Sequence, residues 1–118
     1  MTAAQADDPR SGTVEVVLTG ELDIATVDEV QGRIEAAEAG SPPLLVIDLS
    51  RLEFVDSSGV RLALLADDRA RAAGRRVAVR LGTGHALRVF QALGLMDKLD
   101  VVPLSAPDDA TVDGASRR

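Results

Sequence analysis

The chain has 118 residues and a formal net charge of −6 at pH 7, with 2% aromatic residues and no cysteine. That length suits a single domain with an adequate hydrophobic core, and the lack of cysteine excludes disulfides, thiolate nucleophiles and cysteine-based metal sites. The negative charge disfavours binding to a nucleic-acid backbone, and the few aromatic residues leave no platform on which bases would stack.

The two ends of the chain are polar. Residues 1–12 contain Pro9 and Gly12, and residues 105–118 (SAPDDATVDGASRR) are similar, so both are predicted to be flexible tails around a folded unit at residues 13–104. The N-terminal segment carries acids where a signal peptide carries basic residues, and no apolar run approaches the roughly 20 residues that a membrane span requires. We therefore expect a cytoplasmic protein that makes no contact with a membrane.

The first predicted strand covers residues 14–19, where Val and Leu alternate with partly polar residues, and Gly20 is predicted to end it. A helix is predicted to begin at Thr26, which forms a capping-box pattern with Glu29, and to end at Gly40. Apolar residues recur along this helix at steps of three and four. Its apolar stripe must therefore cover a sheet.

The next predicted strand, LLVIDL at residues 44–49, is apolar on both faces, which is typical of a central parallel strand with cover on each side. A second helix is predicted from Ser57 to about Ala73, capped by Asp56 and the serines and closed by Gly74. A third strand at residues 77–81, a short helix at residues 86–93 and an edge strand at residues 99–104 complete the pattern. Alternating strands and helices predict an α/β fold with right-handed crossovers.

Two short segments resemble known motifs: Gly20-Glu21-Leu22-Asp23 after the first strand and Phe54-Val55-Asp56-Ser57-Ser58-Gly59 at the start of the second helix. Together with the strand LLVIDLS and the later stretch from Arg88 to Leu95, they resemble the STAS family, in particular the bacterial anti-sigma factor antagonists, over about residues 14–102. The resemblance implies a STAS-like α/β fold with a mostly parallel sheet of four to five strands and three to four helices. Family members often begin with an extra antiparallel strand, which residues 1–12 look too polar to supply.

The resemblance also implies a function as a binding module that is not an enzyme. In such antagonists the serine directly after the motif aspartate is phosphorylated, and here that serine is Ser57. The unphosphorylated form would bind an anti-sigma factor with serine kinase activity and release a sigma factor, and a phosphatase would restore it after phosphorylation. No cofactor and no metal are expected, since ATP would belong to the partner. Asp23 and Asp56 would shape the site, Ser58 would cap the helix and Gly59 would give the partner clearance.

The position of Ser57 suits this role on physical grounds. A helix start presents unpaired N–H groups and a partial positive charge, so a phosphate is accommodated there without unfolding the helix. Asp23, Asp48 and Asp56 are expected to meet at the carboxyl ends of neighbouring strands. They would make the surroundings acidic, so that an added dianion changes the binding surface by repulsion.

Other interpretations of the same residues remain. Asp-Ser-Ser before an apolar run is also an ordinary helix cap. STAS domains also serve as scaffolds or accessory subunits of stress-signalling complexes and lipid transporters, which is the alternative function. A small hydrolase is the least favoured, because Ser57 and His85 lack a G-x-S-x-G elbow and Gly82-Thr83-Gly84 lacks a P-loop lysine. His85, the sole histidine, cannot build a usual zinc site and is expected to be solvated at a helix start.

Overall fold

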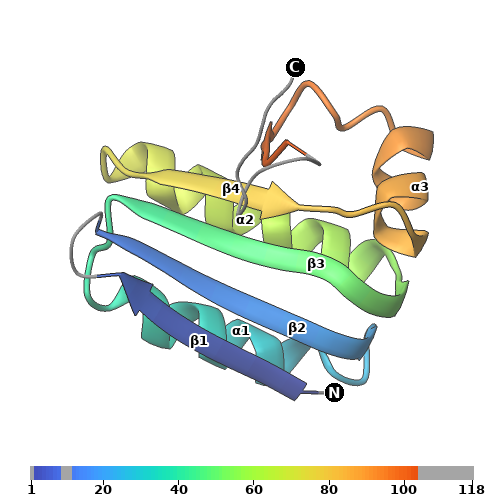
Figure 1. The fold of residues 1–118 in the computed structure, drawn as a ribbon, viewed down its shortest axis with the longest axis horizontal. Coiled ribbons are helices and arrows are strands. Elements are labelled where there is room, and N and C mark those ends of the chain that lie inside the picture. Colours follow the sequence, from blue (N-terminus) through green and yellow to red (C-terminus); the bar gives the residue numbers. More distant parts are fainter. Residues whose placement is uncertain (1, 9–11, 104–118) are drawn as a thin grey trace, which may run out of the picture.

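The computed structural model describes residues 2–8 and 12–103. Its elements follow the order β1 (Thr2–Asp8), β2 (Thr13–Leu22), α1 (Val27–Glu38), β3 (Leu44–Val55), α2 (Ser57–Ala72), β4 (Arg76–Arg80), α3 (His85–Ala92) and β5 (Asp100–Val101). The strands form one five-stranded sheet in the order β1-β2-β3-β4-β5, in which β1 is antiparallel to β2 and all other neighbours are parallel (Figure 1). The predicted α/β fold with a mostly parallel sheet is confirmed.

The N-terminal strand corrects the prediction that residues 1–12 form a flexible tail. Thr2–Asp8 pairs with β2 over its whole length, from Thr2 opposite Thr19 to Asp8 opposite Thr13. The physical reason is that an edge strand is held by backbone hydrogen bonds, which polar and apolar residues make equally well, and polar sequences are common at sheet edges. The expected tail at residues 105–118 lies outside the described residues.

Three predicted strand ends were also placed wrongly. The strand expected at residues 44–49 continues as β3 to Val55. Gly20 does not end β2; it has a backbone φ of 85° and lies at one of two shifts in the register between β2 and β3. Because glycine adopts this conformation without a steric penalty, the strand bends there and continues to Leu22. At the other edge β5 has only two residues, Asp100 and Val101, where residues 99–104 were expected.

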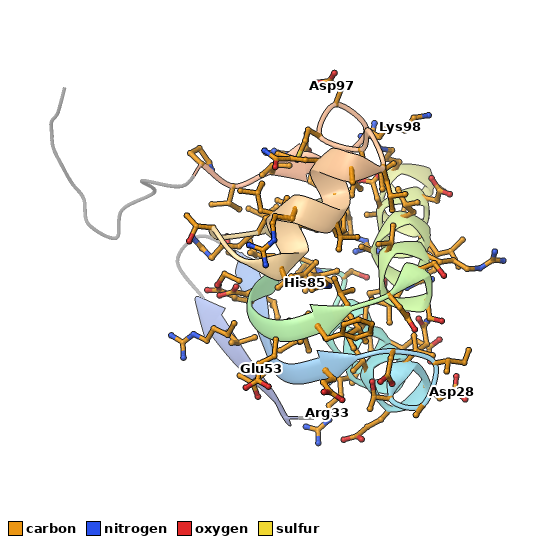
Figure 2. All side chains as sticks on the ribbon, turned by 90° about the vertical axis from the view of Figure 1, so that its right-hand side faces the viewer. Asp28, Arg33, Glu53, His85, Asp97 and Lys98 are labelled. Carbon is orange, nitrogen blue, oxygen red and sulfur yellow. The ribbon has the colours of Figure 1, made fainter. Side chains whose placement is uncertain are left out.

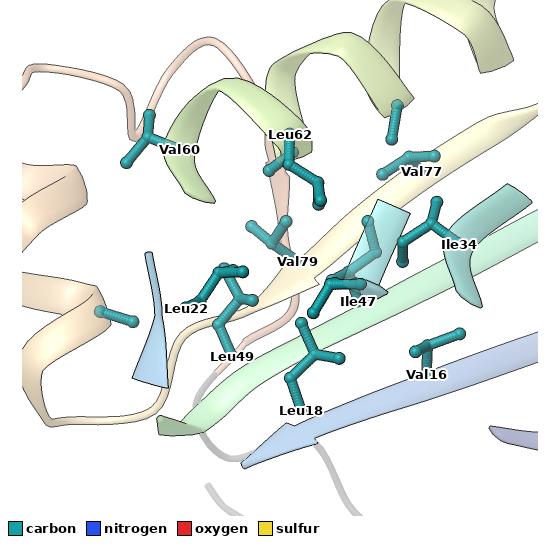
Figure 3. Packing of buried hydrophobic residues seen from close by; sticks show 14 of the residues in the cluster. Val16, Leu18, Leu22, Ile34, Ile47, Leu49, Val60, Leu62, Val77 and Val79 are labelled. Atoms are coloured by element: carbon teal, nitrogen blue, oxygen red, sulfur yellow. The ribbon is translucent and has the colours of Figure 1, made fainter. Parts of the chain in front are cut away.

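The core lies between the sheet and two helices, α1 and α2, which cover the same face of the sheet (Figures 1 and 2). Figure 3 shows its central layer, where alternate residues of β2, β3 and β4 point at the helices: Val16, Leu18, Leu22, Ile47, Leu49, Val77 and Val79. Three alanines of α2 are fully buried at this contact, which lets the helix approach the sheet closely: Ala63, Ala66 and Ala70. Residues 45–49 of β3 are all buried, so the expected cover on both faces is confirmed.

The third helix lies elsewhere, at the end of the sheet where β2, β3 and β4 finish (Figure 1). It contributes the fully buried Phe90 to the same core. At the opposite end of the two long helices, the guanidinium of Arg69 in α2 donates to both carboxylate oxygens of Glu38 in α1. In the described part of the chain, no helix combines the length and the apolar character needed to cross a membrane.

The core predicts the effect of shortening a central side chain. Ile47 is fully buried in β3, and Ile47→Ala is expected to lower the free energy of unfolding by roughly 2 to 5 kcal/mol, because the lost contacts leave a cavity. Denaturant titration measures this change. The matched control is Leu65→Ala, which truncates a side chain that is 41% exposed on α2 and should have a much smaller effect. Equal midpoints for Ile47→Ala and the parent protein would contradict the placement of Ile47.

Candidate functional site

The loop after β2 is held by its own side chains. The Asp23 carboxylate accepts hydrogen bonds from the backbone N–H groups of Ala25 and Thr26, at 2.9 and 3.1 Å. The Thr26 hydroxyl accepts from Asp23 N–H at 3.0 Å and donates to the carbonyl of Glu21 at 2.9 Å. The predicted capping box of Thr26 with Glu29 is therefore wrong, since the Thr26 hydroxyl is used within the loop and caps no N–H of α1.

Asp56 joins this loop to the start of α2. It is the N-cap of the helix, and its carboxylate accepts from Ser58 N–H at 2.8 Å and from Gly59 N–H at 3.4 Å. The second carboxylate oxygen accepts from the backbone N–H of Ile24 at 3.3 Å, and Asp56 N–H donates to the carbonyl of Leu22 at 3.1 Å. The two motifs that the sequence separates by more than thirty residues thus share one carboxylate. Asp23 and Asp56 lie at one site, as expected.

Ser57 is the first residue of α2 and is exposed to solvent, while Ser58 behind it is half-buried. Among the described residues, the Ser57 hydroxyl has no hydrogen-bond partner. Asp56, and not Ser58, caps the helix, because its carboxylate takes the N–H groups that a Ser58 hydroxyl would otherwise compete for. Ser57 is consequently a hydroxyl on the surface, held in place by a well-capped helix.

Gly59 has a packing role that differs from the expected one. The glycine is buried, and a Cβ placed on it would lie 2.6 Å from Cγ2 of Val55 and 2.7 Å from Cγ of Leu22. The hydrogen that replaces a side chain therefore faces the ends of β2 and β3. The prediction that Gly59 clears space for a partner is corrected, since the space it leaves is filled by the protein's own core.

His85 is the first residue of α3 (Figure 2), and its ring contacts the end of β3 just before Asp56. Its ring stacks on that of Phe54, with centroids 5.2 Å apart and planes at 24°, and its Nε2 lies 3.3 Å from the carbonyl oxygen of Val55. His85 lies at a helix start as expected, but its ring is half-buried by these contacts and not fully solvated. Phe54 remains 41% exposed and Ile24, in the loop after β2, is 77% exposed. Neither was proposed as a site residue; the one available signal was that Phe54 is one of only two aromatic residues in the chain.

Asp48 does not belong to this site. Its carboxylate accepts from the backbone N–H and the hydroxyl of Ser50, at 2.9 and 2.6 Å, and lies 3.6 Å from Nε of Arg80. Asp48 pairs with Val17 in the sheet, eight residues before Asp56, which corresponds to roughly 20 Å or more along the strand. The expected cluster of Asp23, Asp48 and Asp56 is corrected to two carboxylates, because β3 runs on past Asp48 to Val55.

Known proteins resemble the chain in sequence and in fold. A family model described as Mlab, STAS domain matches residues 6–103. An anti-sigma factor antagonist from Mycobacterium paratuberculosis is similar, with a TM-score of 0.78 and 28% identity, over 91% of this chain and 87% of that one. SpoIIAA in its unphosphorylated form is similar with a TM-score of 0.65 and 27% identity, over 93% and 90% of the two chains.

The Bacillus cell fate determinant SpoIIAA in its phosphorylated form gives a TM-score of 0.64 at 27% identity, over 86% of this chain and 92% of that one. No curated protein sequence matches the chain. The residues matched by the family model include both motifs of the site.

The packing of Gly59 predicts opposite effects for two glycine substitutions. Gly59→Ala is expected to destabilise the protein by about 1 to 3 kcal/mol, because the new methyl group collides with Leu22 and Val55. Gly32→Ala, in the middle of α1, has open space around the new Cβ and should stabilise by about 0.5 to 1 kcal/mol through helix propensity. Thermal or chemical unfolding of the two variants checks the sign. A stabilising Gly59→Ala would contradict the tight contact.

The hydrogen bonds of the Asp56 carboxylate predict what happens when that carboxylate is removed. Asp56→Ala is expected to lower the free energy of unfolding by about 1 to 2 kcal/mol through loss of the cap, and to speed hydrogen exchange at the Ile24 amide, whose acceptor disappears. Asp68→Ala removes an exposed carboxylate from the same helix and serves as the control. If the Ile24 amide exchanges equally fast in the parent and in Asp56→Ala, the bridge between the two motifs does not exist in solution.

Proposed function

The chain belongs to the STAS domain family, and on that premise we propose that it is an anti-sigma factor antagonist whose binding is controlled by phosphorylation of Ser57. The unphosphorylated form captures an anti-sigma factor with serine kinase activity and so releases a sigma factor. The kinase then phosphorylates Ser57 and ends the capture, and a phosphatase restores the first state. All of these steps take place in the cytoplasm.

The observation that carries this proposal is the exposed hydroxyl of Ser57 on a rigid support. Asp56 holds the first turn of α2 and the Ile24 amide together, so the serine is presented at a fixed position while its own oxygen stays free for a kinase. Two exposed apolar side chains belong to the segments that meet at Asp56: Ile24 in the loop after β2, whose N–H donates to the Asp56 carboxylate, and Phe54 at the end of β3. Exposed apolar and aromatic groups of this kind are enriched at protein interfaces.

Phosphorylation at this position acts by local electrostatics. Phosphoserine carries about 1.5 to 2 negative charges near neutral pH. At some 6 Å from a carboxylate of the partner and an effective dielectric near 20, each charge pair costs roughly 3 kcal/mol before salt screening. Half of that weakens binding about tenfold. The cap made by Asp56 is independent of Ser57, so the helix stays folded and only the binding surface changes.

The chain acts in this scheme as a substrate and not as a catalyst. A serine nucleophile needs an adjacent base, and in the described residues the Ser57 hydroxyl has none within hydrogen-bond distance. ATP and the phosphoryl-transfer machinery belong to the kinase. Solved relatives of similar sequence are anti-sigma factor antagonists, which supports this division of roles.

A second candidate function is that of a scaffold or an accessory subunit of a stress-signalling complex or a lipid transporter, because STAS domains also occur in such assemblies. The exposed serine at position 57 favours the switch. Affinity capture from the native cell extract, with mass spectrometry of the bound proteins, separates the two. A captured serine kinase or anti-sigma factor supports the proposal, and captured transporter subunits favour the second candidate.

The proposal predicts the behaviour of Ser57→Ala. This variant should keep its fold and bind the anti-sigma factor permanently, because only one exposed oxygen is removed and the N-cap is supplied by Asp56. Incubation with the captured kinase and labelled ATP should leave it unlabelled. Ser58→Ala is the matched control, since it removes the neighbouring hydroxyl, and it should be labelled like the parent. Stoichiometric labelling of Ser57→Ala would move the phosphorylation site to another residue.

A further inference from the structure

Arg61 lies one helical turn after Ser57 on the exposed side of α2. Both residues are exposed, and residues four apart on a helix are neighbours on its surface, with Cβ atoms roughly 5 to 6 Å apart. Side chains on a helix lean toward its N-terminus, so a residue covers the turn before its own Cα. The side chain of Arg61 is therefore long enough and suitably placed for its guanidinium to reach the turn that contains Ser57 and Ser58.

Arg61 has no anionic partner in the unmodified protein. Among the described residues it forms no ion pair and no hydrogen bond, whereas five other arginines are paired with carboxylates: Arg33, Arg69, Arg71, Arg76 and Arg80. Along α2 its neighbours at three and four residues are two serines and two leucines, so the helix offers it no acid. Within residues 2–8 and 12–103 no carboxylate forms an ion pair with Arg61, so a phosphate on Ser57 would give it an anionic partner one turn away on the same helix.

Few backbone N–H groups in the first turn of α2 are free to bind such a phosphate. Ser58 and Gly59 N–H both donate to the Asp56 carboxylate, and Val60 N–H donates to the Asp56 carbonyl. The expected cradle of unpaired N–H groups at the helix start is thus already occupied by Asp56, whose own charge repels a phosphate. A side-chain cation near Ser57 would add an attraction that the occupied N–H groups of the helix terminus do not provide.

We propose that Arg61 binds the phosphoryl group of phosphorylated Ser57 through a charge-assisted hydrogen bond, which deepens the function proposed above and rests on it. Guanidinium groups match the geometry of phosphate oxygens and pair with them in a bidentate manner. Before phosphorylation the exposed face beside Ser57 carries the free positive charge of Arg61. After phosphorylation the phosphate neutralises this charge and the same face becomes negative. One modification therefore removes a free cation from the surface that the partner contacts and adds an anion to it.

The test uses the full chain with phosphoserine incorporated at position 57 by genetic encoding, which needs no kinase. Titration by phosphorus NMR near 0.1 M salt measures the pKa of the phosphate, whose ordinary value is about 6. Arg61→Gln is expected to raise that pKa by about 0.2 to 0.4, because the cation that favours the dianion is lost. Arg61→Lys should keep part of the effect. The difference should shrink in 1 M salt, where the screening length falls to about 3 Å.

The control is Arg71→Gln, which removes one positive charge from the same helix, fourteen residues or about 21 Å from Ser57. It should leave the phosphate pKa unchanged. An unchanged pKa in Arg61→Gln, or an equal rise in Arg71→Gln, would overturn the inference. Binding of the anti-sigma factor to the phosphorylated and unphosphorylated parent is measured separately. Undiminished binding of the phosphorylated form would count against the proposed function, whereas the contact between Arg61 and the phosphate would still be judged by the pKa measurement.

Discussion

The site depends on the half-buried Asp56, whose carboxylate accepts hydrogen bonds from the N–H groups of two segments of the chain. It caps α2 through Ser58 and Gly59 and holds the loop after β2 through Ile24. Directly beneath it, Gly59 packs on Leu22 and Val55 with no room for a methyl group. Polar and apolar contacts therefore fix the same junction, and the position of Ser57 follows from both.

The sheet makes this junction possible by bringing β2 and β3 to a common end. The register between them shifts twice, and one shift follows Asp48, which folds its carboxylate back onto Ser50. The other lies at Gly20, whose positive φ suits the irregularity. As a result Leu22 and Val55 are paired at the last step of the ladder. Asp48, which looks like a site residue in the sequence, thus makes no contact with the site. It lies next to a register shift that precedes the common end of the two strands.

Under the proposed function, the local charges account for an effect of Ser57 phosphorylation on binding that needs no refolding of the domain. Asp23 and Asp56 have carboxylates already engaged by backbone N–H groups, so they contribute rigidity as well as charge. Ser57 has its oxygen free in a part of the molecule where apolar Ile24 and Phe54 are exposed. Under the proposed function, a charge introduced there meets the desolvated surface of the bound partner, where Coulomb interactions are screened less than in water.

Local patterns in the sequence determined the order of strands and helices, the aliphatic core and the identity of the two motifs, because periodicity, capping and glycine positions act within a few residues. Contacts between distant residues were decided only by the tertiary structure. Residues 2–8 pair as an edge strand through backbone bonds that polar composition does not reveal, Gly59 faces the core, and His85 stacks on Phe54. Asp48 is separated from Asp56 by the later part of β3, which continues to Val55. In each case the deciding quantity was a register or a distance across the fold, which depends on how whole elements pack and is absent from any short window of sequence.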